Sequence, residues 1–304
     1  MSAVVVKDLH KRYGDNHAVR GLSFEVMQGE VFAIVGPNGA GKTSTVEILE
    51  GHRRRSAGEV KVLGFDPETG GRAFRERIGI VLQEAGMEDL FTARELISHY
   101  AGFYPSPLDV EEVIRFVGLQ DKADERTRTL SGGQRRRVDL ALGLIGDPDL
   151  IFLDEATTGF DPSARRQAWD LVAGLCRVGK TVILTTHYME EAYRLADRIA
   201  VIADGRLVAL GTPAELMQRT KAGRTTIAFR LPTAGLELPP LEGEATVEDG
   251  MVQVMSPAAT KDLQTLTGWA LARHVELLDL RLNQASFEDS YLELVSTGGG
   301  GSHV

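Results

Sequence analysis

One glycine-rich segment, Gly36-Pro-Asn-Gly-Ala-Gly-Lys42-Thr43, constrains this chain more than any other feature of its sequence. It follows residues 31–35, an apolar and partly β-branched run typical of a buried strand, and it leads into residues 43–49, which have a helical pattern. Glycines let the backbone curl so that successive N–H groups point at one anion, and the helix N-terminus adds partial positive charge. Lys42 supplies a charge for terminal phosphates, and Thr43 supplies a hydroxyl for Mg²⁺. The alternative is a glycine turn without a ligand, but the strand before the segment and the helix after it favour a nucleoside triphosphate site.

A second apolar run ends in two acidic residues. Residues 150–153 are Leu-Ile-Phe-Leu, the pattern of a parallel strand buried on both faces, and Asp154 and Glu155 follow directly. At the end of such a strand, Asp154 can complete a Mg²⁺ shell and Glu155 can polarise the water that attacks the γ-phosphate. An acidic strand end alone also begins many solvated loops. The glycine-rich segment, here called the phosphate loop, belongs to the same predicted sheet, and this favours the catalytic interpretation.

A serine and two glycines precede an arginine-rich helix start. Ser131 is a good N-cap for a predicted helix over residues 132–145, and Gly132 and Gly133 leave N–H groups uncovered, as in an anion site. Taken alone, the segment fits an ordinary capped helix equally well. The following run of three arginines is open to two interpretations, a nucleic-acid patch or ion pairs on a helix surface. For Arg135 and Arg137 we favour the ion pairs.

Strands and helices alternate along most of the chain, which predicts a mostly parallel α/β sheet. Within it, residues 84–145 have helical patterns and are expected to form a helical insert. The alternation breaks near residues 219–224, and beyond it we expect a small α+β domain over residues 224–297. Its predicted elements are strands 225–230, 245–248, 251–255 and 275–281 and helices 258–272 and 284–295. Residues 298–304 are a glycine-rich tail, expected to be flexible.

Charge and hydropathy exclude two classes of protein. The 34 basic and 43 acidic side chains give a net charge of −9, which argues against a general nucleic-acid coat. The longest apolar runs are about five residues, far short of the ~20 that span a bilayer. We therefore expect neither nucleic acid as a partner nor a membrane span.

Phosphate loop, serine–glycine segment and acidic strand, in this order, resemble the nucleotide-binding subunits of ABC transporters. The resemblance covers about residues 1–220. It implies an α/β P-loop NTPase fold, that of an ABC ATPase, with a helical subdomain at about residues 84–145, followed here by the small C-terminal α+β domain. It also implies that the chain binds ATP and Mg²⁺ and hydrolyses ATP.

The resemblance assigns roles to individual positions. Glu155 matches the catalytic base, His187 the histidine that contacts the γ-phosphate, and Gln83 the glutamine that contacts Mg²⁺ and senses the membrane partner. Mg²⁺ ligands are expected from Thr43, Gln83 and Asp154. Residues expected to bind nucleotide, in one copy or across a dimer, are Tyr13 (stacked on adenine), Gly36, Pro37, Asn38, Gly39, Ala40, Gly41, Lys42, Thr43, Ser44, Ser131, Gly133, Gln134 and Asp161.

Three positions depart from the usual family pattern without removing a functional group, namely Leu82, Ala156 and Phe160. Two segments point to a subfamily. Arg135-Arg-Arg-Val-Asp139-Leu-Ala-Leu and the ending Ser286-Phe-Glu-Asp-Ser-Tyr-Leu-Glu-Leu294 are similar to those of the daunorubicin/doxorubicin-resistance type of exporter ATPase.

That subfamily implies an ATPase that powers efflux of a small, drug-like molecule. Its partner would be a separate transmembrane permease of the ABC-2 type at the cytoplasmic face of the cell membrane, and the chain would form an ATP-dependent head-to-tail homodimer. The alternatives are an importer subunit and a soluble ABC ATPase outside transport. The sequence identifies neither the transported substrate nor the permease, and it assigns no role to the C-terminal domain.

Overall fold

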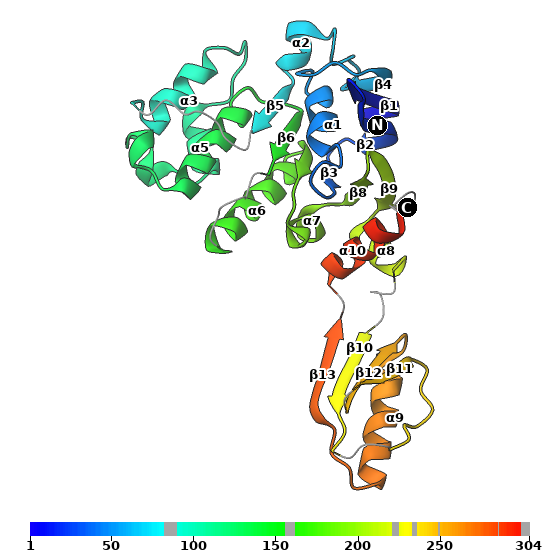
Figure 1. The fold of residues 1–304 in the computed structure, drawn as a ribbon. Helices are drawn as coiled ribbons and strands as arrows, with labels where there is room; N and C mark the ends of the chain where they lie inside the picture. Colours follow the sequence, from blue (N-terminus) through cyan, green and yellow to red (C-terminus); the bar gives the residue numbers. More distant parts are fainter. Residues whose placement is uncertain are drawn as a thin grey trace. The chain divides into compact units, whose positions relative to one another are not determined.

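The structure is a computed structural model that describes residues 1–81, 90–155, 162–220, 225–232, 236–248, 250–284 and 286–298. The chain divides into two compact units, Met1–Pro213 and Ala214–Thr297 (Figure 1). In the described residues no helix combines the length and the apolar character needed to cross a bilayer.

A six-stranded sheet forms the centre of the first unit. Its strand order is β5-β6-β7-β3-β8-β9, and all neighbours are parallel except β8 and β9. Every residue of β3 and β7 is buried, as expected for a sheet covered on both faces. The predicted mostly parallel α/β sheet is thus confirmed. The strands are β3 (Val31–Val35), β5 (Ile78–Val81), β6 (Leu150–Asp154), β7 (Thr181–Thr185), β8 (Arg198–Ala203) and β9 (Arg206–Gly211).

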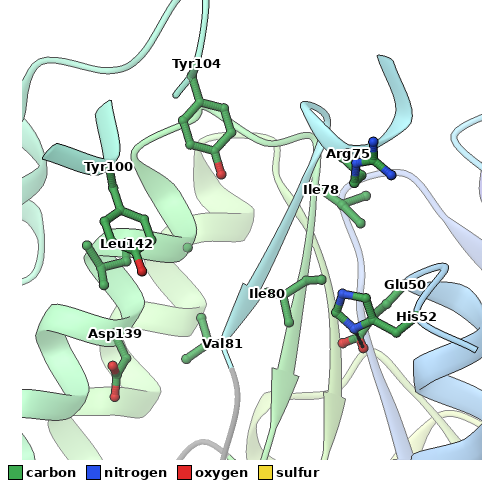
Figure 2. Close-up of a pocket in the computed structure, with 11 residues that line it drawn as sticks. Glu50, His52, Arg75, Ile78, Ile80, Val81, Tyr100, Tyr104, Asp139 and Leu142 are labelled. Atoms are coloured by element: carbon green, nitrogen blue, oxygen red, sulfur yellow. Dashed lines mark ion pairs between the residues drawn. The ribbon is translucent and has the colours of Figure 1, made fainter. Parts of the chain in front are cut away.

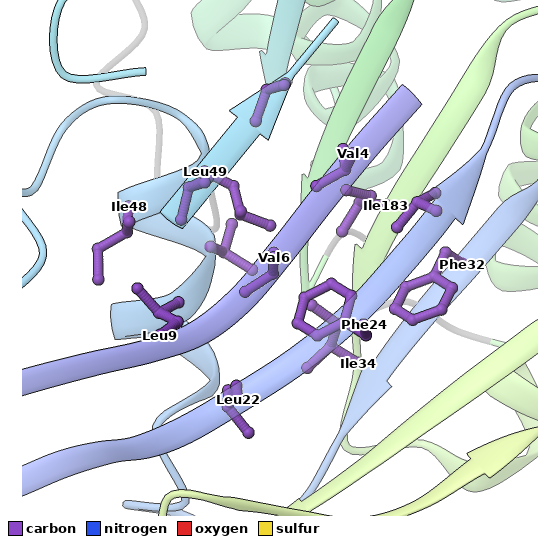
Figure 3. Close-up of a cluster of buried hydrophobic side chains, with 14 of the residues drawn as sticks. Val4, Val6, Leu9, Leu22, Phe24, Phe32, Ile34, Ile48, Leu49 and Ile183 are labelled. Carbon is purple, nitrogen blue, oxygen red and sulfur yellow. The ribbon is translucent and has the colours of Figure 1, made fainter. Parts of the chain in front are cut away.

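A second sheet, which the sequence analysis did not predict, packs over the first. Its order is β2-β1-β4, all antiparallel, formed by β1 (Ser2–Tyr13), β2 (Asn16–Met27) and β4 (Ala57–Val62). Its apolar face meets helix α1 (Lys42–Leu49) and the central sheet in one buried cluster, in which the rings of Phe24 and Phe32 stack at 5.4 Å (Figure 3). This packing fixes the β1–β2 turn, and therefore Tyr13, relative to the phosphate loop.

Helices predominate between β5 and β6. The segment contains α3 (Ala93–Ala101), α4 (Val110–Phe116) and α5 (Gly132–Leu144), and α5 packs against β5. Thr92 and Ser131 each begin a helix with a reciprocal capping box, closed by Glu95 and Gln134 respectively. The remaining helices of this unit are α2 (Gly71–Arg75), α6 (Pro162–Arg177) and α7 (Met189–Leu195).

The second unit is a small α+β domain, as predicted. Its antiparallel sheet has the order β11-β12-β10-β13, and helix α9 packs against β10 over a core that includes Ile227, Phe229 and Leu266. Its last strand and helix each begin three residues later than predicted, and the helix starts directly after Ser286, whose side chain accepts a hydrogen bond from the N–H of Asp289. The elements are α8 (Pro213–Gln218), β10 (Thr225–Arg230), β11 (Glu244–Glu248), β12 (Met251–Ser256), α9 (Ala259–Ala272), β13 (Leu278–Gln284) and α10 (Phe287–Gly298).

Candidate functional site

The glycine-rich segment forms the loop between β3 and α1, as its pattern predicts. A Cβ at Gly36 would lie 2.1 Å from the carbonyl oxygen of Ile202, so only glycine fits there. Gly41 has φ +98°, and a Cβ on it would lie 2.5 Å from the carbonyl oxygen of Ala18. The loop therefore needs these glycines to run close to neighbouring backbone and still open its N–H groups toward one space.

Lys42 lies almost buried beneath this loop, with 8% of its surface exposed. Its Nζ donates hydrogen bonds to the carbonyl oxygens of Gly36, at 2.8 Å, and of Pro37, at 3.1 Å. Burial lowers the pKa of Lys42, while the nearby carboxylates of Glu155 and Asp154 oppose that change. A cation held by neutral carbonyls in a concave loop is well placed to receive phosphate oxygens.

A cavity of about 290 Å³ opens over the loop and gathers most of the predicted nucleotide residues. It brings residues 13 and 38–44 together with two carboxylates that lie more than 100 positions further along the chain. Two of its residues, Asn16 and Ala18, were missed by the sequence analysis because they belong to the unpredicted strand β2. The lining consists of Tyr13, Asn16, Ala18, Asn38, Gly39, Ala40, Gly41, Lys42, Thr43, Ser44, Asp154 and Glu155.

The two acids sit at the end of β6, with β7 between them and the strand that leads into the loop. Thr185 of β7 donates its hydroxyl to the Asp154 carboxylate. The N–H of Glu155 lies 3.1 Å from the carbonyl oxygen of Thr185 and 3.2 Å from its hydroxyl. Glu155 has φ +47°, an uncommon conformation for a side chain of this type. The chain thus turns sharply at Glu155 and presents both carboxylates to the cavity.

His187 follows β7 and lies beside the second acid. Its Nδ1 is 3.6 Å from Oε1 of Glu155, and the histidine side chain is 42% exposed. His187 is not among the residues that line the cavity. It therefore stands at the open edge of the site, next to Glu155.

Tyr13 reaches the cavity from the end of β1. Its hydroxyl is 3.0 Å from Oγ of Ser44, and its ring is 38% exposed. The Nζ of Lys11 and the guanidinium of Arg53 lie 4.8 Å and 5.2 Å from the ring centroid. An exposed ring beside a phosphate loop can stack on a base, and the two cations add positive charge at this end of the cavity.

The serine–glycine segment does not line this cavity. Ser131 is exposed and caps α5, accepting a hydrogen bond from the N–H of Gln134, whose Oε1 accepts in turn from the N–H of Ser131. Gly133 lies in the first turn of the same helix. Arg135 donates to the carbonyls of Thr127 and Arg128, and Arg137 to those of Val117 and Gly118.

These arginines therefore hold loops of the helical segment through hydrogen bonds to carbonyls, where we expected ion pairs, and Arg137 also donates to Oε1 of Gln167 on α6. Of the other singled-out positions, Leu82, Gln83, Ala156, Phe160 and Asp161 lie outside the described residues.

Thr43 and Asp154 provide a set of oxygens that fits Mg²⁺. This ion prefers few protein ligands, one or two carboxylates with water and substrate phosphates completing the shell. Within the described ranges, no three histidine, cysteine or acidic residues gather in a way that would hold a metal by themselves. The donor set thus suits a metal that arrives with a phosphorylated ligand.

A second cavity, of about 310 Å³, lies at the edge strand β5 and is lined both by the helical segment and by residues just after α1. Glu50 and His52 approach it from one side of β5, and Tyr100 and Asp139 from the other (Figure 2). The Glu50 side chain is only 3% exposed, and its Oε2 lies 3.3 Å from Nδ1 of His52. Its Oε1 has no hydrogen-bond partner within the part of the chain that is described. Burial, helped by the negative charges of Asp154 and Glu47, raises the pKa of Glu50 to about 8.

Glu50→Gln is expected to change how stability depends on pH. In the unfolded chain this carboxyl loses its proton near its ordinary pKa of 4.5, but the folded chain keeps the proton until about pH 8. The folded state binds more protons in that window, so the contribution of Glu50 to stability declines as the pH rises through it. Glutamine does not titrate. The free energy of unfolding of the variant, relative to the parent, should therefore rise by about 3 kcal/mol between pH 5.5 and 8.5.

Denaturant unfolding at the two pH values measures this difference. Glu59→Gln, an exposed change on β4, is the control and should show no such trend. An equal offset between Glu50→Gln and the parent at both pH values would contradict the assignment of a raised pKa.

Comparison with known proteins places this geometry in a family. The family model described as ABC transporter matches residues 19–158, and a model for the C-terminal domain of ABC transporter domain-containing proteins matches residues 225–286. The chain is 36% identical to a daunorubicin resistance ATP-binding protein of Streptomyces coeruleorubidus over 96% of both chains. It is 42% identical to the Nod factor export ATP-binding protein I of Burkholderia orbicola, over 70% of this chain and 71% of that one.

Two solved structures agree with the fold. One is cbiO1 from Clostridium perfringens, part of the cbiONQ ABC transporter complex, with a TM-score of 0.65 and 28% identity over 71% of this chain and 91% of that one. The other is a dimeric ATP-binding cassette in a post-hydrolysis state with ADP and phosphate, with a TM-score of 0.62 and 25% identity over 69% of this chain and 98% of that one. With one relative matching nearly the whole chain, and the phosphate loop and paired acids joined in one cavity, this protein belongs to the ABC transporter family as one of its ATP-binding, ATP-hydrolysing subunits.

Proposed function

We propose that this chain powers an exporter by hydrolysing ATP in the cavity over the phosphate loop. One observation carries the proposal, namely that the loop, the buried Lys42 and the two carboxylates at the end of β6 line one cavity. Phosphoryl transfer needs these elements together, because its catalysis rests on positioning and on stabilising charge.

Each residue of the site has a distinct role in ATP hydrolysis. Lys42 and the loop N–H groups hold the phosphate chain, and Tyr13 stacks on the base. Thr43, Asp154 and Gln83 would hold Mg²⁺, which when bound neutralises phosphate charge. Glu155 orients the attacking water and accepts its proton, and His187, 3.6 Å from it, contacts the γ-phosphate.

A second copy of the chain completes the site. Ser131, Gly133 and Gln134 do not line the cavity of their own chain, and Ser131 is exposed at the start of α5. In a head-to-tail dimer, Ser131 and Asp161 of one copy would reach the nucleotide held by the other, and two equivalent sites would form. A nucleotide that binds the closed dimer more tightly than the open one then drives closure, and hydrolysis releases it.

The names of the relatives suggest the cargo. One is a drug resistance protein and another serves Nod factor export, so both point toward efflux of small molecules. This chain would act at the cytoplasmic face of the membrane, attached to a separate permease of the ABC-2 type that contains the substrate path. Its own residues supply the ATPase.

Co-purification from native membranes tests the transport role. An N-terminally tagged chain should bring with it a polytopic membrane protein after gentle solubilisation. Lys42→Ala, carrying the same tag, is the matched bait and separates partner binding from ATP binding. Recovery of ribosomes or DNA-repair proteins in place of a membrane protein would contradict the exporter assignment, as would recovery of no partner at all.

A further inference from the structure

We propose that Arg136 is a positioning residue that links the helix starting at Ser131 to the two catalytic acids. The inference rests on the proposed roles of Asp154 and Glu155 and extends them. Of the three consecutive arginines, Arg136 is the one that donates a hydrogen bond to the end of β6.

Arg136 extends from α5 into the interior. Only 11% of its side chain is exposed, and its Nη2 donates a hydrogen bond of 3.2 Å to the carbonyl oxygen of Asp154. Its Nη1 lies 3.7 Å from Oδ2 of Asp139, one helical turn further on and equally buried. Asp139 supplies the negative charge that a buried guanidinium requires. Arg135 donates to carbonyls of the helical segment, and Arg137 donates both to such carbonyls and to Oε1 of Gln167 on α6.

The carbonyl that Arg136 contacts belongs to the peptide between the two acids. On the other side of that peptide, the N–H of Glu155 faces Thr185 of β7. The peptide is therefore held from both sides, by α5 through Arg136 and by the central sheet through Thr185. Its orientation sets where Asp154 and Glu155 point, and Glu155 is held there at φ +47°.

The hydrogen bond from Arg136 thus connects α5 directly to the peptide between Asp154 and Glu155. The helix begins at Ser131, which in the proposed dimer touches the nucleotide of the partner copy. Arg136 lies five residues further along, so a shift of α5 changes the hydrogen bond to Asp154. We infer that Arg136 aligns Glu155 with the attacking water when the dimer closes. Nucleotide binding by the phosphate loop does not need this bond.

Arg136→Met tests the inference, with Arg135→Met and Arg137→Met as matched controls. Each variant removes one guanidinium from the same helix and leaves an unbranched side chain about as long as the arginine's aliphatic stem. For Arg136→Met we expect kcat for ATP hydrolysis to fall about 10- to 100-fold while the Kd for ATP stays within about twofold of the parent. The control variants lose hydrogen bonds to loop carbonyls and, for Arg137→Met, one to Gln167 on α6, but none to the peptide between the two acids, so their kcat should stay within about threefold of the parent. Arg136→Lys keeps a charge beside Asp139 and one donor, so it should retain a larger share of kcat than methionine.

Rates are expressed per mole of full-length chain that binds ATP, so a partly unfolded variant still gives an interpretable value. A kcat for Arg136→Met equal to that of the controls would overturn the inference, and so would a loss confined to ATP affinity. Glu155→Gln measured alongside separates the two hypotheses. If Glu155→Gln retains its rate, the proposed base is wrong; if it loses the rate and Arg136→Met does not, only the positioning role is wrong.

Discussion

Glu155→Gln is expected to lower kcat for ATP hydrolysis by about 100-fold or more while ATP binding persists. Glutamine has nearly the shape of glutamate, but its amide does not accept a proton from the attacking water. The backbone N–H at this position still reaches Thr185, so the turn at the end of β6 is preserved. ATP should then bind without turning over, and the closed dimer should accumulate.

Steady-state hydrolysis and gel filtration with Mg-ATP measure the two parts of this result. Glu59→Gln, which makes the same chemical change at an exposed position of β4, is the control and should hydrolyse ATP as the parent does. Parental kcat in Glu155→Gln would remove Glu155 from the role of base, and a variant that stays monomeric with ATP would count against the proposed dimer.

Lys42→Ala is expected to act on binding instead. The substitution removes the one ammonium that the loop carbonyls of Gly36 and Pro37 hold under the phosphate site. Charge-assisted bonds to phosphate are among the strongest polar contacts a protein makes. We expect the Kd for ATP to rise about 100-fold, which corresponds to about 3 kcal/mol.

Equilibrium titration with ATP measures this change, and thermal unfolding shows whether the loop still folds. Lys61→Ala, on the exposed side of β4, removes a lysine without touching the loop and should bind ATP normally. An unchanged Kd in a folded Lys42→Ala variant would refute the role of Lys42 in holding phosphates. Together the two variants separate binding from chemistry, because Lys42→Ala loses the first and Glu155→Gln only the second.

Contiguous segments of the sequence were sufficient to predict much of the site. The phosphate loop and the acids after β6 are local patterns, in which strand, turn and helix signals lie within a few residues of each other. Because the carboxyl ends of parallel strands share one edge of a sheet, the sequence predicts Asp154 and Glu155 beside the phosphate loop, and in the structure both acids and Lys42 line one cavity. Ser131 likewise predicts the start of its helix, because an N-cap and its partner, here Gln134, are only three residues apart.

Other features depend on contacts between distant segments, which no local pattern records. The long strands β1 and β2 pair through a turn, and that pairing places Asn16 and Ala18 in the cavity beside Tyr13. In the sequence, nothing distinguishes Glu50 from an ordinary glutamate at the end of a helix. Only the packing around the end of α1 buries it and raises its pKa to about 8.

Arg136 best illustrates the difference between what local sequence patterns predict and what tertiary contacts decide. The sequence by itself determined that three arginines follow the serine–glycine segment on a helix, and that two acids end a buried strand. Nothing in that run distinguishes its middle member from its neighbours. Tertiary structure decided that the middle side chain reaches the end of β6, because packing of α5 against β5 fixes the direction in which each arginine extends. A guanidinium excluded from water must find partners, and it finds Asp139 and the carbonyl of Asp154.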